Sequence, residues 1–192
     1  MKLVIGLGNP GPEYVATRHN VGFMAVERLI DDLKGKFKTW GQQKNALLAD
    51  VSIDGERVLV LKPLTYMNLS GQAAVAAAHF YKILPEDICV LHDELDLPLG
   101  TVRLKTGGGP GGHNGLRSLI ASLATPNFSR VRMGVGKPEN KDDTSDFVLG
   151  PFRKQDLPLV EDMIERALQA IAAFAKGEKA FLAAMNTLNQ RN

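Results

Sequence analysis

Two sets of polar residues could together carry out general acid–base chemistry. His19 lies in Thr17-Arg18-His19-Asn20, directly before a helical pattern, where a lone histidine is usually a surface or capping residue. The second set follows the apolar run 88–91 and contains three acidic residues, Asp93, Glu94 and Asp96. Carboxylates at the carboxyl end of a buried strand occupy the usual position of active sites in α/β sheets. One of them beside His19 would fix the tautomer of the imidazole and favour its basic form.

The acidic cluster also admits two other interpretations, a cation site and a solvated turn. No histidine or acidic cluster elsewhere supplies an obvious second half for a metal site, so we expect no metal. His79 lies in an alanine-rich helical segment and His92 at a strand end, and both are expected to be structural. Cys89 lies in an apolar strand segment and is expected to be a small core residue.

Three carboxamides, Asn9, Asn68 and Asn114, each follow a strand or a glycine loop. Helix capping alone would explain Asn68 and Asn114. If the three converge on one cleft, each offers a donor and an acceptor without charge, which matches a peptide backbone. Tyr14 and Tyr66 are candidate flat surfaces for a base or a ribose, or else core residues.

The segment 107–115 contains six glycines among nine residues and leads into a helical pattern. Such a flexible, donor-rich loop before a helix suits an anion or a carbonyl oxygen. No acidic residue occurs between Asp96 and Glu139, whereas six basic residues do: Arg103, Lys105, Arg117, Arg130, Arg132 and Lys137. This local field attracts phosphate. Because the net charge is only +2, the pattern indicates a nucleic-acid site at a defined spot.

Strand and helix patterns alternate along the 192 residues, which predicts a single α/β domain over residues 1–192 with a mixed sheet flanked by helices. Asp54-Gly55 marks a hairpin. We expect a mobile surface loop at 137–145. Strands are expected at 3–5, 47–53, 57–61, 88–91, 101–105 and 130–135. Helices are expected at 21–33, 69–80, 116–123, 156–174 and 178–188.

Gly6-Leu7-Gly8-Asn9-Pro10-Gly11 fits the dinucleotide-binding pattern G-x-G-x-x-G. A Rossmann turn runs straight into a helix, but Pro10 and Pro12 interrupt this entry and the helical pattern begins only near Val21. A nucleotide-cofactor oxidoreductase is therefore disfavoured. The chain has no apolar run of secretory-signal or membrane-spanning length, so a cytoplasmic protein without membrane contact is expected.

Four blocks of the chain resemble the bacterial-type peptidyl-tRNA hydrolase family in content and order. They are Gly6–Gly11 with Tyr14 and Arg18–Asn20, Lys62–Gly71, His92–Asp96, and Gly107–Leu116. The resemblance implies a single α/β domain with a mixed twisted sheet, usually monomeric. It also implies an enzyme that uses no metal or cofactor. The enzyme hydrolyses the ester between a peptide and the 3′-terminal ribose of tRNA, which recycles tRNA from aborted translation.

The resemblance also assigns roles to individual residues. His19 matches the general base, Asp93 its orienting carboxylate, and Asn9 the residue that checks whether the α-amino group is acylated. Positions that match tRNA- or peptide-contacting residues are Tyr14, Tyr66, Met67, Asn68 and Asn114. Lys105 and Arg132 match basic positions that hold the tRNA 5′-phosphate, so the partner is expected to be the acceptor end of peptidyl-tRNA.

The residues leave part of the mechanism open. The donor to the developing oxyanion is Asn9, Asn68 or a backbone amide of the glycine loop. Two other functions compete: a catalytically silent RNA-binding protein on the same scaffold, and a hydrolase of free peptides. The pairing of His19 with Asp93 argues against the first, and the absence of an evident activated serine or metal set argues against the second.

Overall fold

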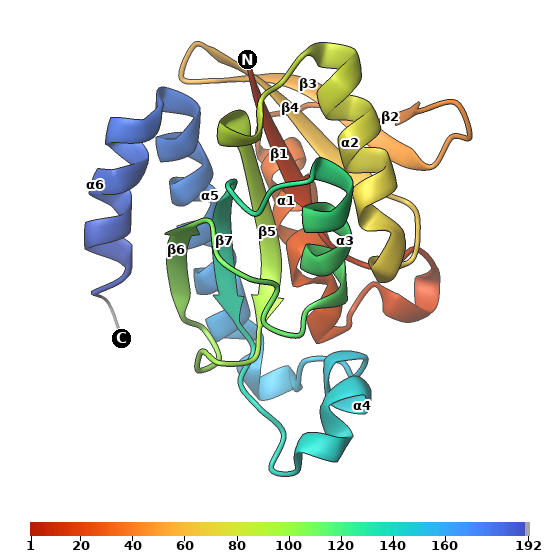
Figure 1. Ribbon diagram of the computed structural model, residues 1–192. Helices are drawn as coiled ribbons and strands as arrows, with labels where there is room; N and C mark the ends of the chain where they lie inside the picture. Colours follow the sequence, from red (N-terminus) through yellow and green to blue (C-terminus); the bar gives the residue numbers. More distant parts are fainter. Residues whose placement is uncertain (191–192) are drawn as a thin grey trace.

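The computed structural model describes residues 1–190, which form one seven-stranded sheet with helices on both faces (Figure 1). The strands are β1 Lys2–Gly6, β2 Lys38–Trp40, β3 Ala46–Ile53, β4 Glu56–Pro63, β5 Ile88–Glu94, β6 Val102–Thr106 and β7 Ser129–Gly134. The helices are α1 Val21–Asp32, α2 Ser70–Tyr81, α3 Asn114–Leu123, α4 Thr144–Val148, α5 Leu157–Lys176 and α6 Glu178–Leu188. The predicted α/β class with a mixed sheet is confirmed.

The sheet order is β2-β3-β4-β1-β5-β7-β6. The four central strands β4, β1, β5 and β7 are parallel, and the flanking strands β2, β3 and β6 are antiparallel to their neighbours. The predicted hairpin joins β3 to β4 through Asp54 and Gly55, which have φ values of +50° and +87°. Two positive φ angles in a two-residue loop match the twist of the paired strands.

Two apolar cores lie on opposite faces of the sheet. Helices α1, α5 and α6 cover one face, and α2 and α3 cover the other (Figure 1). In β5 the side chains alternate: Cys89 and Leu91 enter the first core, and Ile88 and Val90 enter the second. Cys89 is fully buried as predicted, and burial raises the pKa of its thiol. The next two side chains of the strand, His92 and Asp93, are polar and also buried.

The carboxyl ends of the four parallel strands meet at one edge of the sheet. Asn9 follows β1 there, Met67 follows β4, and Asp93 lies near the end of β5. The start of α1 packs closely on this edge, because a Cβ at Gly22 would lie 2.4 Å from the carbonyl oxygen of Leu91. Glycine at this position lets the residues just before α1, including His19, approach β5.

The structure differs from the sequence-based prediction in two short elements. The segment predicted as a loop over 137–145 contains the 3₁₀ helix Lys141–Asp143 and the start of α4. Helix α4 lies beyond the ends of the strands and does not cover either face of the sheet (Figure 1). Strand β2 was not predicted, because three residues at a sheet edge leave no clear pattern. Across residues 1–190, no helix combines the length and the apolar character that crossing a bilayer requires.

Candidate active site

A cleft of about 610 Å³ lies at the carboxyl edge of the parallel strands. Most of the residues singled out from the sequence line it, namely Asn9, His19, Tyr66, Met67, Asn68, Asp93 and Asn114. The remaining lining residues come mainly from the end of β5, the glycine loop and α4: His92, Glu94, Leu95, Pro110, Gly111, Gly112, His113, Thr144, Ser145, Val148 and Leu149. The fold therefore gathers six separate stretches of the chain around one solvent-accessible space.

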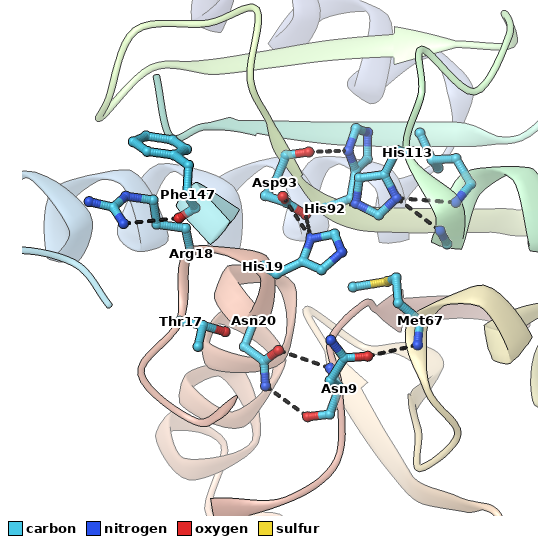
Figure 2. Close-up of polar contacts among 12 residues, drawn as sticks. Asn9, Thr17, Arg18, His19, Asn20, Met67, His92, Asp93, His113 and Phe147 are labelled. Atoms are coloured by element: carbon cyan, nitrogen blue, oxygen red, sulfur yellow. Dashed lines mark hydrogen bonds and ion pairs between the residues drawn. The ribbon is translucent and has the colours of Figure 1, made fainter. Parts of the chain in front are cut away.

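His19 and Asp93 are in direct contact within this cleft (Figure 2). His19 belongs to the 3₁₀ helix Arg18–Asn20, which we call the His19 turn, and Asp93 belongs to β5. Nδ1 of His19 lies 2.9 Å from Oδ2 and 3.0 Å from Oδ1 of Asp93. The Asp93 side chain is only 2% exposed and the His19 side chain 13% exposed. With Nδ1–H donated to Asp93, Nε2 of the neutral ring keeps its lone pair.

A second imidazole, His113, contacts the same carboxylate. Its Nε2 lies 2.7 Å from Oδ1 of Asp93. His113 is the N-cap residue of α3, and its Nδ1 accepts hydrogen bonds from the backbone N–H groups of Gly115 and Leu116, at 3.1 and 3.3 Å. These two donors fix the tautomer, since Nδ1 must be unprotonated and Nε2–H must donate to Asp93. Both ring nitrogens of His113 are therefore engaged: Nδ1 accepts from the two amides, and Nε2 carries the proton that it donates to Asp93.

The two imidazoles determine the ionisation of Asp93. Burial by itself would raise the pKa of this carboxyl group, but the N–H donors of His113 and His19, and the charge that either ring carries when it is protonated, outweigh it. The net result is a pKa well below the ordinary value for aspartate, so Asp93 is an anion throughout the neutral range. A buried carboxylate with two N–H donors can stabilise positive charge on either ring.

A third imidazole, His92, lies beside His113 with the ring centroids 5.2 Å apart. Its Nδ1–H donates to the carbonyl oxygen of Asp93 at 2.8 Å, and its Nε2 is buried without a hydrogen-bond partner. Burial, and after it the charge of His113, lowers the pKa of His92 to about 3. His92 is thus a neutral ring that also lines the cleft, whereas His79 is exposed on α2.

Asn9 is buried and its carboxamide has a fixed orientation (Figure 2). Its Oδ1 accepts the backbone N–H of Met67 at 2.8 Å. Its main chain forms two hydrogen bonds with the side chain of Asn20, both at 2.9 Å. Because Oδ1 is engaged, Nδ2 is the part of the Asn9 side chain that remains to act in the cleft. Asn9 therefore offers a donor there, and not the donor and acceptor considered from the sequence.

The other two carboxamides lie at the rim of the cleft, and neither caps a helix with its side chain. Asn68 is exposed, and no side chain caps α2. Asn114 is the first residue of α3, which His113 caps, and its Oδ1 accepts from Arg117 at 2.9 Å. The prediction that Asn68 and Asn114 cap helices is therefore wrong. Both residues line the cleft, as the alternative prediction of converging carboxamides requires.

The two tyrosines form an edge-to-face pair with ring centroids 6.5 Å apart. Tyr66 is 58% exposed and lines the cleft, whereas Tyr14 is partly buried and does not. Neither is a core residue. The pair presents an aromatic surface next to the site.

The glycine loop is held in place by a buried cation. Arg130, only 2% exposed, donates to the carbonyl oxygens of Gly108 and of Gly109, the latter at 2.7 Å. Desolvation, and after it the charge of Arg132, lowers the pKa of Arg130. Its charge is thus committed to the loop and is not displayed to solvent, although the sequence counted it in the basic segment.

Lys105 and Arg132 lie outside the cleft, on the β6–β7 edge. In this antiparallel pair Arg103 is opposite Arg132, and Lys105 is opposite Arg130, so these side chains share one face of the sheet. Arg132 also forms an ion pair of 3.0 Å with Glu94, a residue of the cleft wall. The predicted pair therefore lies diagonally across two strands, and Arg132 connects this basic edge to the cleft.

The three residues around the carboxylate also resemble a metal-binding set. His19, Asp93 and His113 offer ligand atoms within 4.8 Å of one another, so the structure supplies the second half that the sequence did not reveal. A metal on Nε2 of His113 would move the ring proton to Nδ1, where it would oppose the N–H groups of Gly115 and Leu116. This opposition makes His113 a poor ligand, and the two remaining groups are fewer than zinc sites use.

His113 is the main site residue that sequence reasoning missed. In the sequence it is only one member of the glycine-rich segment 107–115. Histidine is not among the preferred N-cap residues, so its capping position carries no strong sequence signal. Its distance from Asp93 along the chain, 20 residues, gives no indication that the two side chains touch.

The chain is similar in sequence and in fold to known proteins. The chain matches the family model for peptidyl-tRNA hydrolase over residues 3–192. It is 44% identical to a peptidyl-tRNA hydrolase of Desulfitobacterium hafniense, over 99% of this chain and 100% of the relative. It is 46% identical to that of Oceanobacillus iheyensis, with the same shares covered. The crystal structure of peptidyl-tRNA hydrolase from Acinetobacter baumannii superimposes with a TM-score of 0.92 at 42% identity, over 100% of this chain and 96% of that one.

Proposed function

This chain belongs to the peptidyl-tRNA hydrolase family, whose enzymes hydrolyse the ester between peptide and tRNA, and we propose that His19 is its general base. The observation that carries the proposal is the bond between Nδ1 of His19 and the buried carboxylate of Asp93. It leaves the Nε2 lone pair to take a proton from a water molecule that attacks the ester carbonyl. General-base assistance of this kind contributes about 10²–10⁴ in rate.

Asp93 and His113 support this base in different ways. The anionic Asp93 stabilises the imidazolium that forms when His19 accepts the proton. His113 holds Oδ1 of the same carboxylate at 2.7 Å and thereby fixes its orientation. His113 is not the base, since the α3 amides occupy its Nδ1 and its Nε2 carries a proton.

Asn9 is the proposed donor to the oxyanion. Attack of water forms a carbon–oxygen bond and places negative charge on the former carbonyl oxygen. Of the three donors that the sequence left open, Asn9 is buried and has its Nδ2 fixed by the Met67 contact, whereas Asn68 is exposed. A preorganised donor needs no reorientation as charge develops. The carbon–ribose oxygen bond then breaks, and the proton held by His19 passes to the departing ribose oxygen.

The charges in the cleft support selection of peptidyl-tRNA over aminoacyl-tRNA. A free aminoacyl group carries an ammonium, whereas a peptidyl group has an amide at the same position. Both carboxylates of the cleft wall are already engaged, Asp93 by two imidazoles and Glu94 by Arg132. Uncharged carboxamides such as Asn68 and Asn114 can pair with an amide but compensate an ammonium poorly.

The tRNA part of the substrate is assigned to the β6–β7 edge. Lys105 and Arg132 would bind phosphates near the 5′ end of the acceptor stem, and Arg132 lies next to the cleft through Glu94. Tyr14 and Tyr66 would provide a surface for the terminal base or ribose, with Met67 in the wall beneath. Because these contacts neutralise phosphate, binding should weaken as salt rises. The chain is proposed to act as a single domain and as a monomer.

The carboxylate provides the test. In Asp93→Asn, we expect kcat on N-acetylated aminoacyl-tRNA to fall by about 10² or more, because the imidazolium loses its counter-charge. tRNA affinity should stay unchanged, and the acidic limb of the pH–rate profile should shift. Assays contain EDTA and also include free aminoacyl-tRNA, which wild-type protein should spare.

The matched control for this test is Asp96→Asn. Asp96 lies three residues further along, is exposed and pairs with Lys137 outside the cleft. This variant should behave like wild type. Equal losses in Asp93→Asn and Asp96→Asn, or an Asp93→Asn enzyme with an unchanged rate, would contradict the assignment.

A further inference from the structure

Three successive residues of the His19 turn contact three different walls of the cleft (Figure 2). His19 contacts Asp93 of β5, and Asn20 forms two hydrogen bonds with Asn9 after β1. Arg18 contacts Phe147 of α4. The first two contacts position groups that the proposed mechanism uses. The third has no part in that mechanism, although it joins the same turn to the remaining wall.

The Arg18–α4 contact is formed by side chain and main chain together. Nη1 of Arg18 donates to the carbonyl oxygen of Phe147 at 3.1 Å, and this carbonyl near the end of α4 also accepts the backbone N–H of Gly150 at 3.2 Å. The guanidinium also lies over the Phe147 ring, 4.2 Å from its centroid. The backbone N–H of Arg18 donates to Gly150 at 3.0 Å, and Thr17 forms a β-bridge with Pro151.

Helix α4 packs against the turn that carries Arg18. It packs mainly against the His19 turn and the 3₁₀ helix Lys141–Asp143, and it does not belong to the layers that cover the sheet (Figure 1). Four residues of this region line the cleft, namely Thr144, Ser145, Val148 and Leu149. Their hydroxyl and aliphatic side chains carry no charge. This wall suits the uncharged acyl part of the substrate better than its phosphates.

The charge of Arg18 serves no ion pair within residues 1–190. Its hydrogen bonds go to main-chain carbonyls, and the nearby Arg153 and Asp156 pair with each other at 2.8 Å. Burial, followed by the charge of Arg153, lowers the pKa of Arg18, while Asp156 opposes the shift. A partly buried cation that contacts a carbonyl and two aromatic rings, those of Phe147 and Phe152, is placed to hold these segments together.

We propose that Arg18 is a positioning residue that fixes α4 against the His19 turn and so shapes the cleft wall that receives the acyl group. The proposal rests on the proposed function of the cleft. Arg18 does not touch the reacting atoms, and the contacts of His19 with Asp93 and of Asn20 with Asn9 do not pass through its side chain. Its loss should therefore weaken substrate binding more than it slows the chemical step.

The test compares Arg18→Met with Arg153→Met. Methionine keeps an unbranched apolar chain but lacks the donor and the charge. For Arg18→Met we expect KM for N-acetylated aminoacyl-tRNA to rise roughly fivefold to tenfold, with kcat within about twofold of wild type and an unchanged pH–rate profile. Hydrogen–deuterium exchange should increase over residues 141–151 but not over α3. Arg153→Met removes an exposed arginine nearby and should leave KM unchanged.

Two further variants make the result decisive. Phe147→Leu removes the ring but keeps the carbonyl, and the double variant with Arg18→Met should raise KM by less than the product of the single effects. Arg18→Lys keeps the charge and should fall between wild type and Arg18→Met. If Arg18→Met does not fold, Arg18→Lys and Phe147→Leu provide the test. A raised KM and faster hydrogen–deuterium exchange over residues 141–151 in both variants support the proposal. Unchanged values in both variants overturn it.

Other outcomes also overturn it. A fall in kcat with a shifted pH profile would mean that Arg18 acts through His19, and equal effects of Arg18→Met and Arg153→Met would mean that bulk charge is responsible. The Asp93→Asn test is judged on kcat and pH dependence, whereas this one is judged on KM and local exchange. The two proposals can therefore fail independently.

Discussion

The His19 turn and the amino end of α3 both place an imidazole against Asp93, but they leave the two rings with different chemistry. In the His19 turn, Nδ1 faces the carboxylate, and the ring lines the cleft with Nε2 uncommitted. At α3, Nε2 faces the carboxylate and the helix amides of Gly115 and Leu116 occupy Nδ1. One residue type on one shared acid thus yields the proposed base in one region and a helix cap in the other.

The difference shows that a histidine's function depends on both of its nitrogens. Contact with a carboxylate is common to both rings and so does not identify the base. What separates them is the local backbone: unpaired N–H groups at the start of a helix require an acceptor, and His113 supplies it. The His19 ring meets no such backbone demand, because no hydrogen bond within residues 1–190 engages its Nε2.

The same substitution at both rings should give the largest contrast. His19→Asn removes the proposed base and should lower kcat by roughly 10³, within the usual range for general-base catalysis. His113→Asn keeps a capping acceptor but loses the hydrogen bond to Asp93, so kcat should fall only about tenfold. Ester cleavage of N-acetylated aminoacyl-tRNA measures both. Comparable losses in the two variants would remove the distinction between the two regions.

The third imidazole, His92, sharpens the comparison through stability. Its pKa in the folded protein is about 3, below the ordinary value of 6.5, so the unfolded chain binds the extra proton between these pH values. Stability should therefore fall as pH drops from about 6.5 towards about 3, with His92 contributing at most about 1.4 kcal/mol per pH unit. His92→Gln should flatten this dependence, as measured by urea unfolding.

The upper part of that pH window isolates His92, because the lowered pKa of Asp93 affects stability only at more acidic pH. Replacement of the exposed His79 by Gln is the matched control and should leave the slope as in wild type. A slope unchanged by His92→Gln would show that His92 is not held neutral by its surroundings.

The smallest effect concerns the cap itself. His113→Ala loses both the cap and the Asp93 contact, whereas His113→Asn loses only the contact. The two variants should differ in free energy of unfolding by about 1 kcal/mol, the usual contribution of an N-cap side chain. Chemical denaturation measures the difference. Equal stability of the two variants would mean that the α3 amides do not depend on this residue, which would free Nδ1 of His113 for chemistry.

Most of the fold followed from local patterns. The helices α1, α2, α5 and α6 begin and end within about three residues of their predicted positions, because apolar residues at helical spacing mark long elements well. The hairpin at Asp54-Gly55 followed from the turn residues alone. Short elements did not follow: β2 and α4 are stabilised by neighbours in space, and a polar segment such as 137–145 carries no periodicity that would reveal a five-residue helix.

The site was predicted less evenly. Residues that follow parallel strands meet at one edge of the sheet, so Asn9 and the acidic cluster after 88–91 could be expected there. The choice of Asp93 as the partner of His19 came from the family resemblance, because the residues alone left three acids open. Contacts that depend on side-chain direction could not be predicted. The sequence did not reveal that His113 reaches Asp93, that Arg130 is turned inward to the glycine loop, or that Asn68 and Asn114 do not cap helices.

By itself, the sequence determined the alternation of strands and helices, the carboxyl-edge location of the polar residues, and the presence of an acid–base pair and a basic segment. Periodicity and chain order are local properties, so they are legible in one dimension. Only the tertiary structure decided which nitrogen of each histidine is free, which amide hydrogen of the cleft is available, and which arginines face solvent. Each of these depends on partners 20 or more residues away or on backbone groups that acquire a direction only once the helix or loop has formed.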